Sequence, residues 1–135
     1  MDNHTTPSIL IVEDHGQTSR IMARLVRARG FQVLTAGSLA EARKCVEQGG
    51  IGFLICDLGL PDGSGSELMT ELQRSLGIKG VAISGFGMEG DIARSNKAGF
   101  AFHLTKPIRI TDLDKVLALA KQEIDQASES ETPRQ

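Results

Sequence analysis

Residues 51–65 read IGFLICDLGLPDGSG and are the most informative segment of the chain. Its apolar first half leads directly to a carboxylate at Asp57. An apolar run of this length is too short for a helix and indicates a strand that is buried on both faces. Pro61, Gly63 and Gly65 then interrupt the pattern and predict a loop. The sequence therefore places Asp57 at the carboxyl end of a buried parallel strand, where open α/β sheets bind ligands.

The composition indicates one domain without a strongly charged surface. The chain has 135 residues, of which 15 are basic and 17 acidic, and a formal net charge of −2. This length suits one domain with a workable core, and the lack of concentrated positive charge argues against nucleic-acid binding. We find no signal peptide and no apolar segment of about 18 residues that could span a membrane. With Cys45 and Cys56 expected as free thiols, the sequence predicts a cytoplasmic protein that binds neither nucleic acid nor membranes.

Strand and helix patterns alternate five times along the chain. Apolar runs predict further strands at 8–12, 31–35, 81–83 and 100–105. Capping residues and periodic apolar positions predict helices at 16–29, 38–48, 64–76, 91–98 and from 111 to about 126. Short connections and right-handed crossovers then predict an α/β fold, with a five-stranded parallel sheet and five helices covering its two faces.

Apolar spacing also predicts which helix residues face the core. They are Ile21, Leu25 and Ala28 in the first helix and Leu68, Leu72 and Leu76 in the third. A single ordered domain is expected over residues 8–126, with disordered segments at 1–7 and 127–135. Three glycines within residues 85–90 predict a mobile loop.

Polar side chains follow four of the predicted strands. The first strand ends at the acid pair Glu13 and Asp14, the central strand at Asp57, the fourth at Ser84 and the fifth at Lys106. Because the carboxyl ends of parallel strands lie at one edge of the sheet, we expect these side chains to converge. Three carboxylates at one place repel each other unless a cation is present, and hard oxygen ligands with room for water suit Mg²⁺.

This group of side chains suits phosphoryl transfer. A carboxylate next to a bound cation can act as a nucleophile and form an aspartyl phosphate, and Asp57 holds the central position. Lys106 could offset charge on the transferring oxygens, and the Ser84 hydroxyl could donate a hydrogen bond to one of them. Phosphoryl transfer depends mainly on positioning and electrostatics, which such a site supplies.

These residues, together with Leu-Gly-Leu-Pro-Asp-Gly-Ser-Gly after Asp57 and Pro107 after Lys106, resemble the receiver domain of two-component response regulators, which is CheY-like. The resemblance covers residues 8–120. It implies a doubly wound, flavodoxin-like sheet with strand order 2-1-3-4-5. It also implies a signalling module that catalyses only its own phosphorylation and dephosphorylation, with a sensor histidine kinase or a histidine phosphotransfer protein as its partner.

The resemblance assigns roles to individual residues. Asp57 is the implied phosphoacceptor, Ser84 and Lys106 contact the phosphoryl group, and the Lys106–Pro107 bond is cis. A Mg²⁺ site is implied at Glu13, Asp14, Asp57 and the backbone carbonyl of Gly59.

Two positions depart from the commonest pattern of this family. The switch position, usually tyrosine or phenylalanine, holds His103, whose ring can titrate near neutral pH or can be an ordinary half-exposed strand residue. Gly59 presents no side chain over the phosphoryl group, which predicts a short-lived phosphorylated form.

Four other interpretations are considered at this stage. Arg20, Arg24 and Arg27 form either a solvated helix face or a docking surface for the phosphodonor. Two motifs, Leu-Gly-Leu-Pro-Asp-Gly-Ser-Gly at 58–65 and His-Leu-Thr-Lys-Pro at 103–107, resemble those in receivers of hybrid histidine kinases. A small aspartyl-phosphate phosphohydrolase would carry a second acid two residues after Asp57, where this chain has Gly59. A phosphorylation-independent receiver-like binding module would more readily lack one of the acids or the lysine, and all are present.

Overall fold

The chain folds around a five-stranded parallel sheet in a computed structural model that describes residues 6–85 and 96–130. The strands are β1 (Ser8–Val12), β2 (Val33–Ala36), β3 (Ile51–Asp57), β6 (Lys79–Ser84) and β7 (Phe102–Thr105). Their order across the sheet is β2-β1-β3-β6-β7, and every pairing between neighbours is parallel. Counted in chain order these strands give 2-1-3-4-5, which confirms the predicted doubly wound fold.

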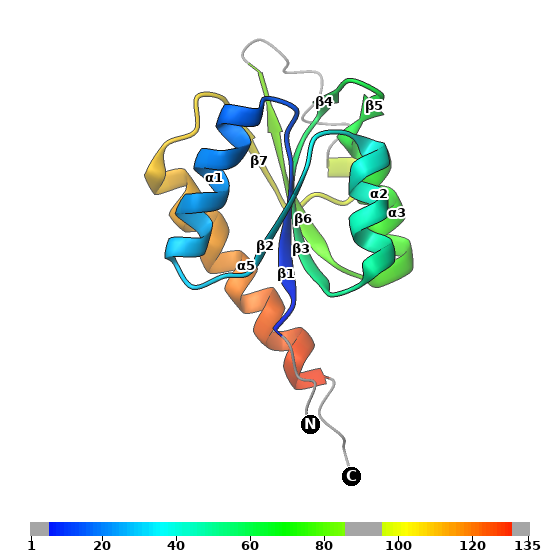
Figure 1. The fold of residues 1–135 in the computed structure, drawn as a ribbon. Coiled ribbons are helices and arrows are strands. Elements are labelled where there is room, and N and C mark those ends of the chain that lie inside the picture. The colour runs from blue at the N-terminus through cyan, green and yellow to red at the C-terminus, as the bar shows by residue number, and fades with distance from the viewer. Residues whose placement is uncertain (1–5, 86–95, 131–135) are drawn as a thin grey trace.

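Helices cover both faces of this sheet (Figure 1). α1 (Gly16–Ala28) and α5 (Ile110–Ser130) lie on one face, and α2 (Leu39–Gln48) and α3 (Gly65–Leu76) on the other. Residues 96–98 are also helical, whereas the rest of the helix expected at 91–98 and most of the loop at 85–90 lie outside the described residues. No helix in the described part of the chain has the length and apolarity needed to cross a membrane.

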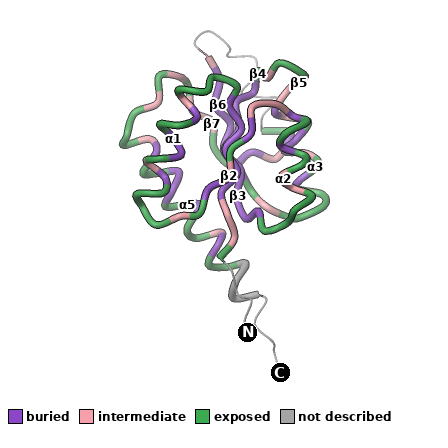
Figure 2. The backbone as a smooth tube through the Cα atoms, in the orientation of Figure 1, coloured by how far each residue is buried: buried purple, intermediate pink, exposed green. Residues whose placement is uncertain are grey.

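The central strand separates two apolar cores. Phe53 and Ile55 pack with α1 and α5, while Leu54 and Cys56 pack with α2 and α3. All seven residues of β3 are buried, including Asp57, and buried residues concentrate on the strands in Figure 2. The prediction of a strand buried on both faces is therefore confirmed.

The predicted inner face of α1 holds only for Leu25, which is half-buried against the core, whereas Ile21 and Ala28 are exposed. The buried residues of this helix are Ser19, Met22, Ala23 and Val26, whereas Ile21 is 51% exposed. The buried set keeps the i, i+3, i+4, i+7 spacing of a helix face, but a serine at its first position hides that period in the sequence. In α3, Leu68 and Leu72 are buried as predicted; Leu76, in the last turn, is 47% exposed and was also assigned wrongly.

The segment after Asp57 is more regular than the predicted loop. It forms a short antiparallel hairpin from β4 (Gly59–Leu60) and β5 (Gly63–Ser64). At its turn, the Asp62 carboxylate accepts hydrogen bonds from the backbone N–H groups of Leu39 and Ala40 at 2.8 and 3.1 Å. The hairpin is thereby fixed to the N-terminus of α2, where a carboxylate is favoured by the free N–H groups and the helix dipole.

The predicted helix caps hold in part. Ser38 accepts a hydrogen bond from the backbone N–H of Glu41, but the Glu41 side chain accepts one from the N–H of Gly37 and not of Ser38, so half of the capping box forms. Ser64 accepts one from Ser66 rather than from Glu67. The last helix begins at Ile110 rather than at residue 111 and continues to Ser130, four residues past the predicted end of the ordered domain. No proline interrupts the chain between these points.

Candidate functional site

Four strand ends bring polar side chains to one edge of the sheet, next to the β4–β5 hairpin at the top of Figure 1. Glu13 follows β1, Asp57 ends β3, Ser84 ends β6 and Lys106 follows β7. Glu13, Asp57 and Ser84 are only 3%, 6% and 2% exposed. Buried polar groups are costly unless they are paired, so the pairing of these side chains determines what the site can do.

Lys106 joins two of the carboxylates. Its Nζ atom lies 2.7 Å from Asp57 Oδ2 and 3.1 Å from Glu13 Oε1. Burial by itself lowers the pKa of Lys106, but the hydrogen bond to Asp57 and the negative charges of Asp57 and Glu13 outweigh burial and raise it. The ammonium is therefore held in its charged form between the two acids. The Lys106–Pro107 peptide bond is cis, as the resemblance implied.

The Asp57 carboxylate is held at both oxygens. Oδ2 receives the Lys106 ammonium, and Oδ1 accepts a hydrogen bond from the backbone N–H of Gly59 at 2.9 Å. Gly59 itself is exposed, and a Cβ atom added there would meet only Asp57 Oδ1, at 3.9 Å. The carboxylate is thus oriented by the chain that follows it, and no side chain at position 59 covers it.

The acid pair after β1 contains one buried and one exposed carboxylate. Burial raises the pKa of Glu13, but the backbone N–H of His15, the Lys106 ammonium and the His15 ring together hold it below its ordinary value. Glu13 Oε1 accepts no hydrogen bond from any residue that the structure describes, although Lys106 is close. Asp14 is exposed. A buried carboxylate oxygen without a hydrogen bond, beside a second carboxylate, is a donor set that fits a divalent cation such as Mg²⁺.

Ser84 is paired with the residue at the predicted switch position. Its Oγ atom lies 2.7 Å from Nε2 of His103, and the ring tautomer decides which atom donates. The two residues come from neighbouring strands, β6 and β7, where Ser84 pairs with Thr105 and His103 with Ala82. The structure therefore brings His103, at the predicted switch position, into contact with Ser84, which the resemblance places at the phosphoryl group.

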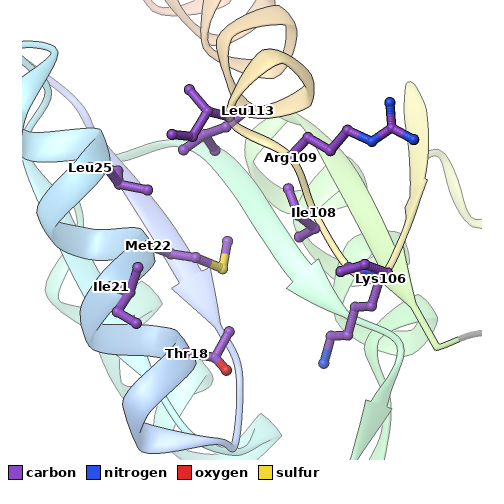
Figure 3. A pocket seen from close by; sticks show the side chains of 10 residues that line it. Thr18, Ile21, Met22, Leu25, Lys106, Ile108, Arg109 and Leu113 are labelled. Carbon is purple, nitrogen blue, oxygen red and sulfur yellow. The ribbon is translucent and has the colours of Figure 1, made fainter.

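An apolar groove runs from this site along α1 (Figure 3). It has a volume of about 500 Å³ and lies between α1 and the segment from Lys106 to the start of α5. Met22 and Ile108 point toward each other across it. Ile21 and Ile110, at its borders, are 51% and 57% exposed. The sequence did not indicate this groove, because Ile21 was expected in the core.

The sequence analysis also missed His15. Its ring lies beside Glu13 and Asp14, with Nδ1 3.1 Å from Glu13 Oε2 and 3.6 Å from Asp14 Oδ1. Its position directly after the acid pair was the feature of the sequence that could have indicated a role in the site.

Arg20, Arg24 and Arg27 are exposed on α1, which fits both a solvated helix face and a docking surface.

Known proteins match this chain over most of its length. A family model described as the response regulator receiver domain matches residues 9–118. The photosynthetic apparatus regulatory protein RegA of Rhodobacter capsulatus is 30% identical over 117 residues, which are 86% of this chain and 63% of that protein. The polar-differentiation response regulator DivK of Brucella ovis is 27% identical over 108 residues, 78% of this chain and 88% of that protein.

A solved structure agrees with these relatives. The response regulator receiver domain (CheY-like) from Methylobacillus flagellatus is 31% identical, with a TM-score of 0.74 over 86% of this chain and 99% of that one. The chain spans less than two thirds of RegA and most of DivK. The resemblance to receivers of hybrid kinases stays a prediction.

Proposed function

The chain belongs to the response regulator receiver domain family of two-component signal transduction, and we propose that its Asp57 accepts a phosphoryl group from a phosphohistidine. The family consists of signalling modules and not of conventional enzymes. The observation that supports the proposal best is the state of the Asp57 carboxylate. It is buried at a strand end, where one oxygen accepts a hydrogen bond from the Lys106 ammonium and the other from the backbone N–H of Gly59.

The proposed reaction is a direct displacement at phosphorus. An Asp57 oxygen forms the new bond to phosphorus, and the bond from phosphorus to the donor imidazole nitrogen breaks with its electron pair moving to that nitrogen. Lys106 already lies beside Asp57, and its ammonium can stabilise the negative charge on the phosphoryl oxygens. Ser84, at the end of the adjacent strand β6, can donate its hydroxyl hydrogen to one of them.

The proposed reaction also uses a Mg²⁺ ion bound next to Asp57. The residues that would hold Mg²⁺ are Glu13, Asp14, Asp57 and the Gly59 carbonyl. The ion, when bound, neutralises charge shared by the carboxylate and the phosphoryl oxygens. Glu13 supports this assignment, because it is buried and one of its oxygens accepts no hydrogen bond from the described residues.

The apolar groove beside Lys106 supports a helical phosphodonor as the partner. An amphipathic helix can place its apolar side chains in such a groove. Ile21 and Ile110 offer exposed apolar contacts at its borders, and Arg20 and Arg24 lie on the same helix as Ile21. A sensor histidine kinase or a histidine phosphotransfer protein would meet this surface with its phosphohistidine near Asp57.

Cys45 and Cys56 are free thiols, which suits the reducing cytoplasm that we propose as the setting.

We assign the switch to Ser84 and His103. If Ser84 turns toward the phosphoryl group, its contact with the His103 ring must change, and the surface of β6 and β7 changes with it. The ¹⁵N shifts of the His103 ring should therefore respond to beryllofluoride, a phosphoryl mimic. Unchanged shifts in protein that binds the mimic would contradict this role.

Intact mass spectrometry tests the central proposal. The wild-type chain, incubated with Mg²⁺ and acetyl phosphate, should gain one phosphoryl group, whereas Asp57→Asn and a sample with chelator should gain none. A gain in Asp57→Asn equal to that of the wild type would exclude Asp57 as the acceptor. No gain and no binding of beryllofluoride in folded wild-type protein would favour a phosphorylation-independent binding module. Continued turnover of an external phosphate ester would favour a phosphohydrolase.

A further inference from the structure

The His15 imidazole lies against both carboxylates of the acid pair. Its Nδ1 atom is 3.1 Å from Glu13 Oε2 and 3.6 Å from Asp14 Oδ1. One ligand atom from each of these three residues lies within 4.8 Å of the other two. We infer that His15 is a ligand of the metal site, which therefore prefers a transition-metal ion such as Mn²⁺ or Co²⁺ to Mg²⁺. This inference rests on the proposed function in taking the acid pair as the metal site.

The spacing of these atoms matches that of ligands around one ion. Metal–ligand bonds of about 2.0–2.2 Å place neighbouring ligand atoms roughly 3 Å apart and opposite ones roughly 4 Å apart. The two distances from Nδ1 fall within this range, and the ligand oxygens of Glu13 and Asp14 lie within 4.8 Å of each other. Three donor atoms can therefore surround one cation without a large movement of the chain.

A buried oxygen gives a second reason to place a cation here. The Glu13 side chain is 1% exposed. Its Oε2 atom accepts a hydrogen bond from the backbone N–H of His15 at 3.0 Å. Its Oε1 atom accepts none from the described residues and forms an ion pair with the Lys106 ammonium at 3.1 Å. Apart from this ion pair the buried oxygen has no partner among the described residues, and a bound cation would complete the coordination of Glu13.

The imidazole nitrogen changes which ion the site favours. Carboxylates and carbonyls suit Mg²⁺ and Mn²⁺. An imidazole ligand adds affinity for transition metals, and this affinity increases from Mn²⁺ through Fe²⁺ to Co²⁺. Mg²⁺ requires oxygen ligands and gains little from nitrogen. The alternative is that His15 only donates a hydrogen bond to Glu13, and in that case its removal would not discriminate between metals.

Metal titrations of His15→Gln and Asp14→Asn separate these possibilities. Calorimetry with Mg²⁺, Mn²⁺ and Co²⁺ gives the affinities, and the visible spectrum of the Co²⁺ form reports on a nitrogen ligand. We expect His15→Gln to weaken Co²⁺ binding by about tenfold or more, with a changed spectrum, while Mg²⁺ binding falls less than about threefold. Asp14→Asn should weaken all three ions. His4→Gln, which also removes one imidazole, is the matched control.

Equal effects of His15→Gln on Co²⁺ and Mg²⁺, or an unchanged Co²⁺ spectrum, would overturn the inference. A Co²⁺ effect as large in His4→Gln would overturn it too. Phosphorylation of the wild type with Mg²⁺ reports on the proposed function separately. If the wild type gains a phosphoryl group and His15→Gln fails to discriminate between metals, only the inference about His15 is lost.

Discussion

The Nζ atom of Lys106 lies 2.7 Å from Oδ2 of Asp57, although 49 residues separate them in the chain. The contact joins the end of the central strand to the segment after the edge strand β7. The Asp57 side chain is 9% exposed and that of Lys106 31%, so the pair is shielded from water more than a surface ion pair. The lysine therefore does two things at once: it relieves the repulsion between Glu13 and Asp57, and it occupies the place where phosphoryl charge would arrive.

A double-mutant cycle should detect this pair. Lys106→Met leaves two buried carboxylates without their cation, so it should lower the free energy of unfolding, and Asp57→Asn should reduce that loss. We expect a coupling energy of about 1–2 kcal/mol from urea unfolding at pH 7. The matched control is Lys79 with Glu123, 3.4 Å apart, in which Lys79 is 53% exposed; its coupling should stay below about 1 kcal/mol. Equal coupling in the two cycles would contradict this account of the site.

Gly59 should set the lifetime of the phosphorylated form. Its Cβ position is open except for Asp57 Oδ1 at 3.9 Å, so a large side chain there would stand next to the acceptor and restrict water. Gly59→Met should therefore lengthen the half-life of the phosphorylated form by about threefold or more. That change corresponds to a rise of roughly 0.7 kcal/mol in the activation free energy of hydrolysis. The measurement is the decay of phosphorylated protein by intact mass after the donor is removed. A half-life unchanged or shortened in Gly59→Met would count against it.

Gly65 should tolerate no side chain. A Cβ atom there would lie 2.5 Å from the backbone oxygen of Asp57 and 2.7 Å from Cys56 Sγ. Gly65→Ala must therefore shift α3 or the end of β3, and it should lower the free energy of unfolding by about 2–3 kcal/mol. Gly59→Ala is the control, since its added methyl group meets ordinary contact distances; its effect in urea unfolding should be within about 0.5 kcal/mol. If both variants were equally stable, the close packing of α3 on Asp57 would be wrong.

Ile21 should matter for a protein phosphodonor and not for a small one. It is 51% exposed at the border of the groove, so Ile21→Lys should fold normally. We expect unchanged phosphorylation by acetyl phosphate and at least about tenfold slower phosphotransfer from the histidine phosphotransfer protein that serves the wild type best, a loss near 1.4 kcal/mol. Leu76→Lys, at an exposed leucine on α3, is the control. Equal rates from the protein donor for wild type and Ile21→Lys would remove the groove from the docking surface.

Asp62 should make the stability depend on acid pH. The backbone N–H of Leu39 lowers its pKa most, opposed by partial desolvation and assisted by the N–H of Ala40. Because the folded-state pKa is depressed, its contribution is complete above the unfolded-state pKa of about 3.9 and is lost as the pH falls toward the folded value. Asp62→Asn keeps an oxygen acceptor without the charge. The stability difference between wild type and Asp62→Asn should thus be present at pH 6 and shrink toward pH 3 in urea titrations; a difference independent of pH would contradict the assignment.

Local sequence patterns were enough to predict the sheet and the residues that gather at its edge. Apolar runs that stop at Glu13, Asp57, Ser84 and Lys106 are local patterns, and the alternation of strands with helices allows few topologies. Parallel strands end at the same edge, so local information was enough to predict that these side chains converge. The family resemblance then predicted strand order, which the structure confirms.

Which side chains meet and which stay exposed depends on how the elements pack in three dimensions. The 2.7 Å contacts of Lys106 with Asp57 and of Ser84 with His103 depend on the relative placement of separate strands. Ile21 was assigned to the core because its spacing with Leu25 is helical, but the rotation of α1 on the sheet is set by how Met22 and Val26 pack against β1 and β3. That rotation leaves Ile21 at the edge of a groove. Helical periodicity shows that a helix has an apolar face, whereas the shape of the surface it packs on determines which residues are buried.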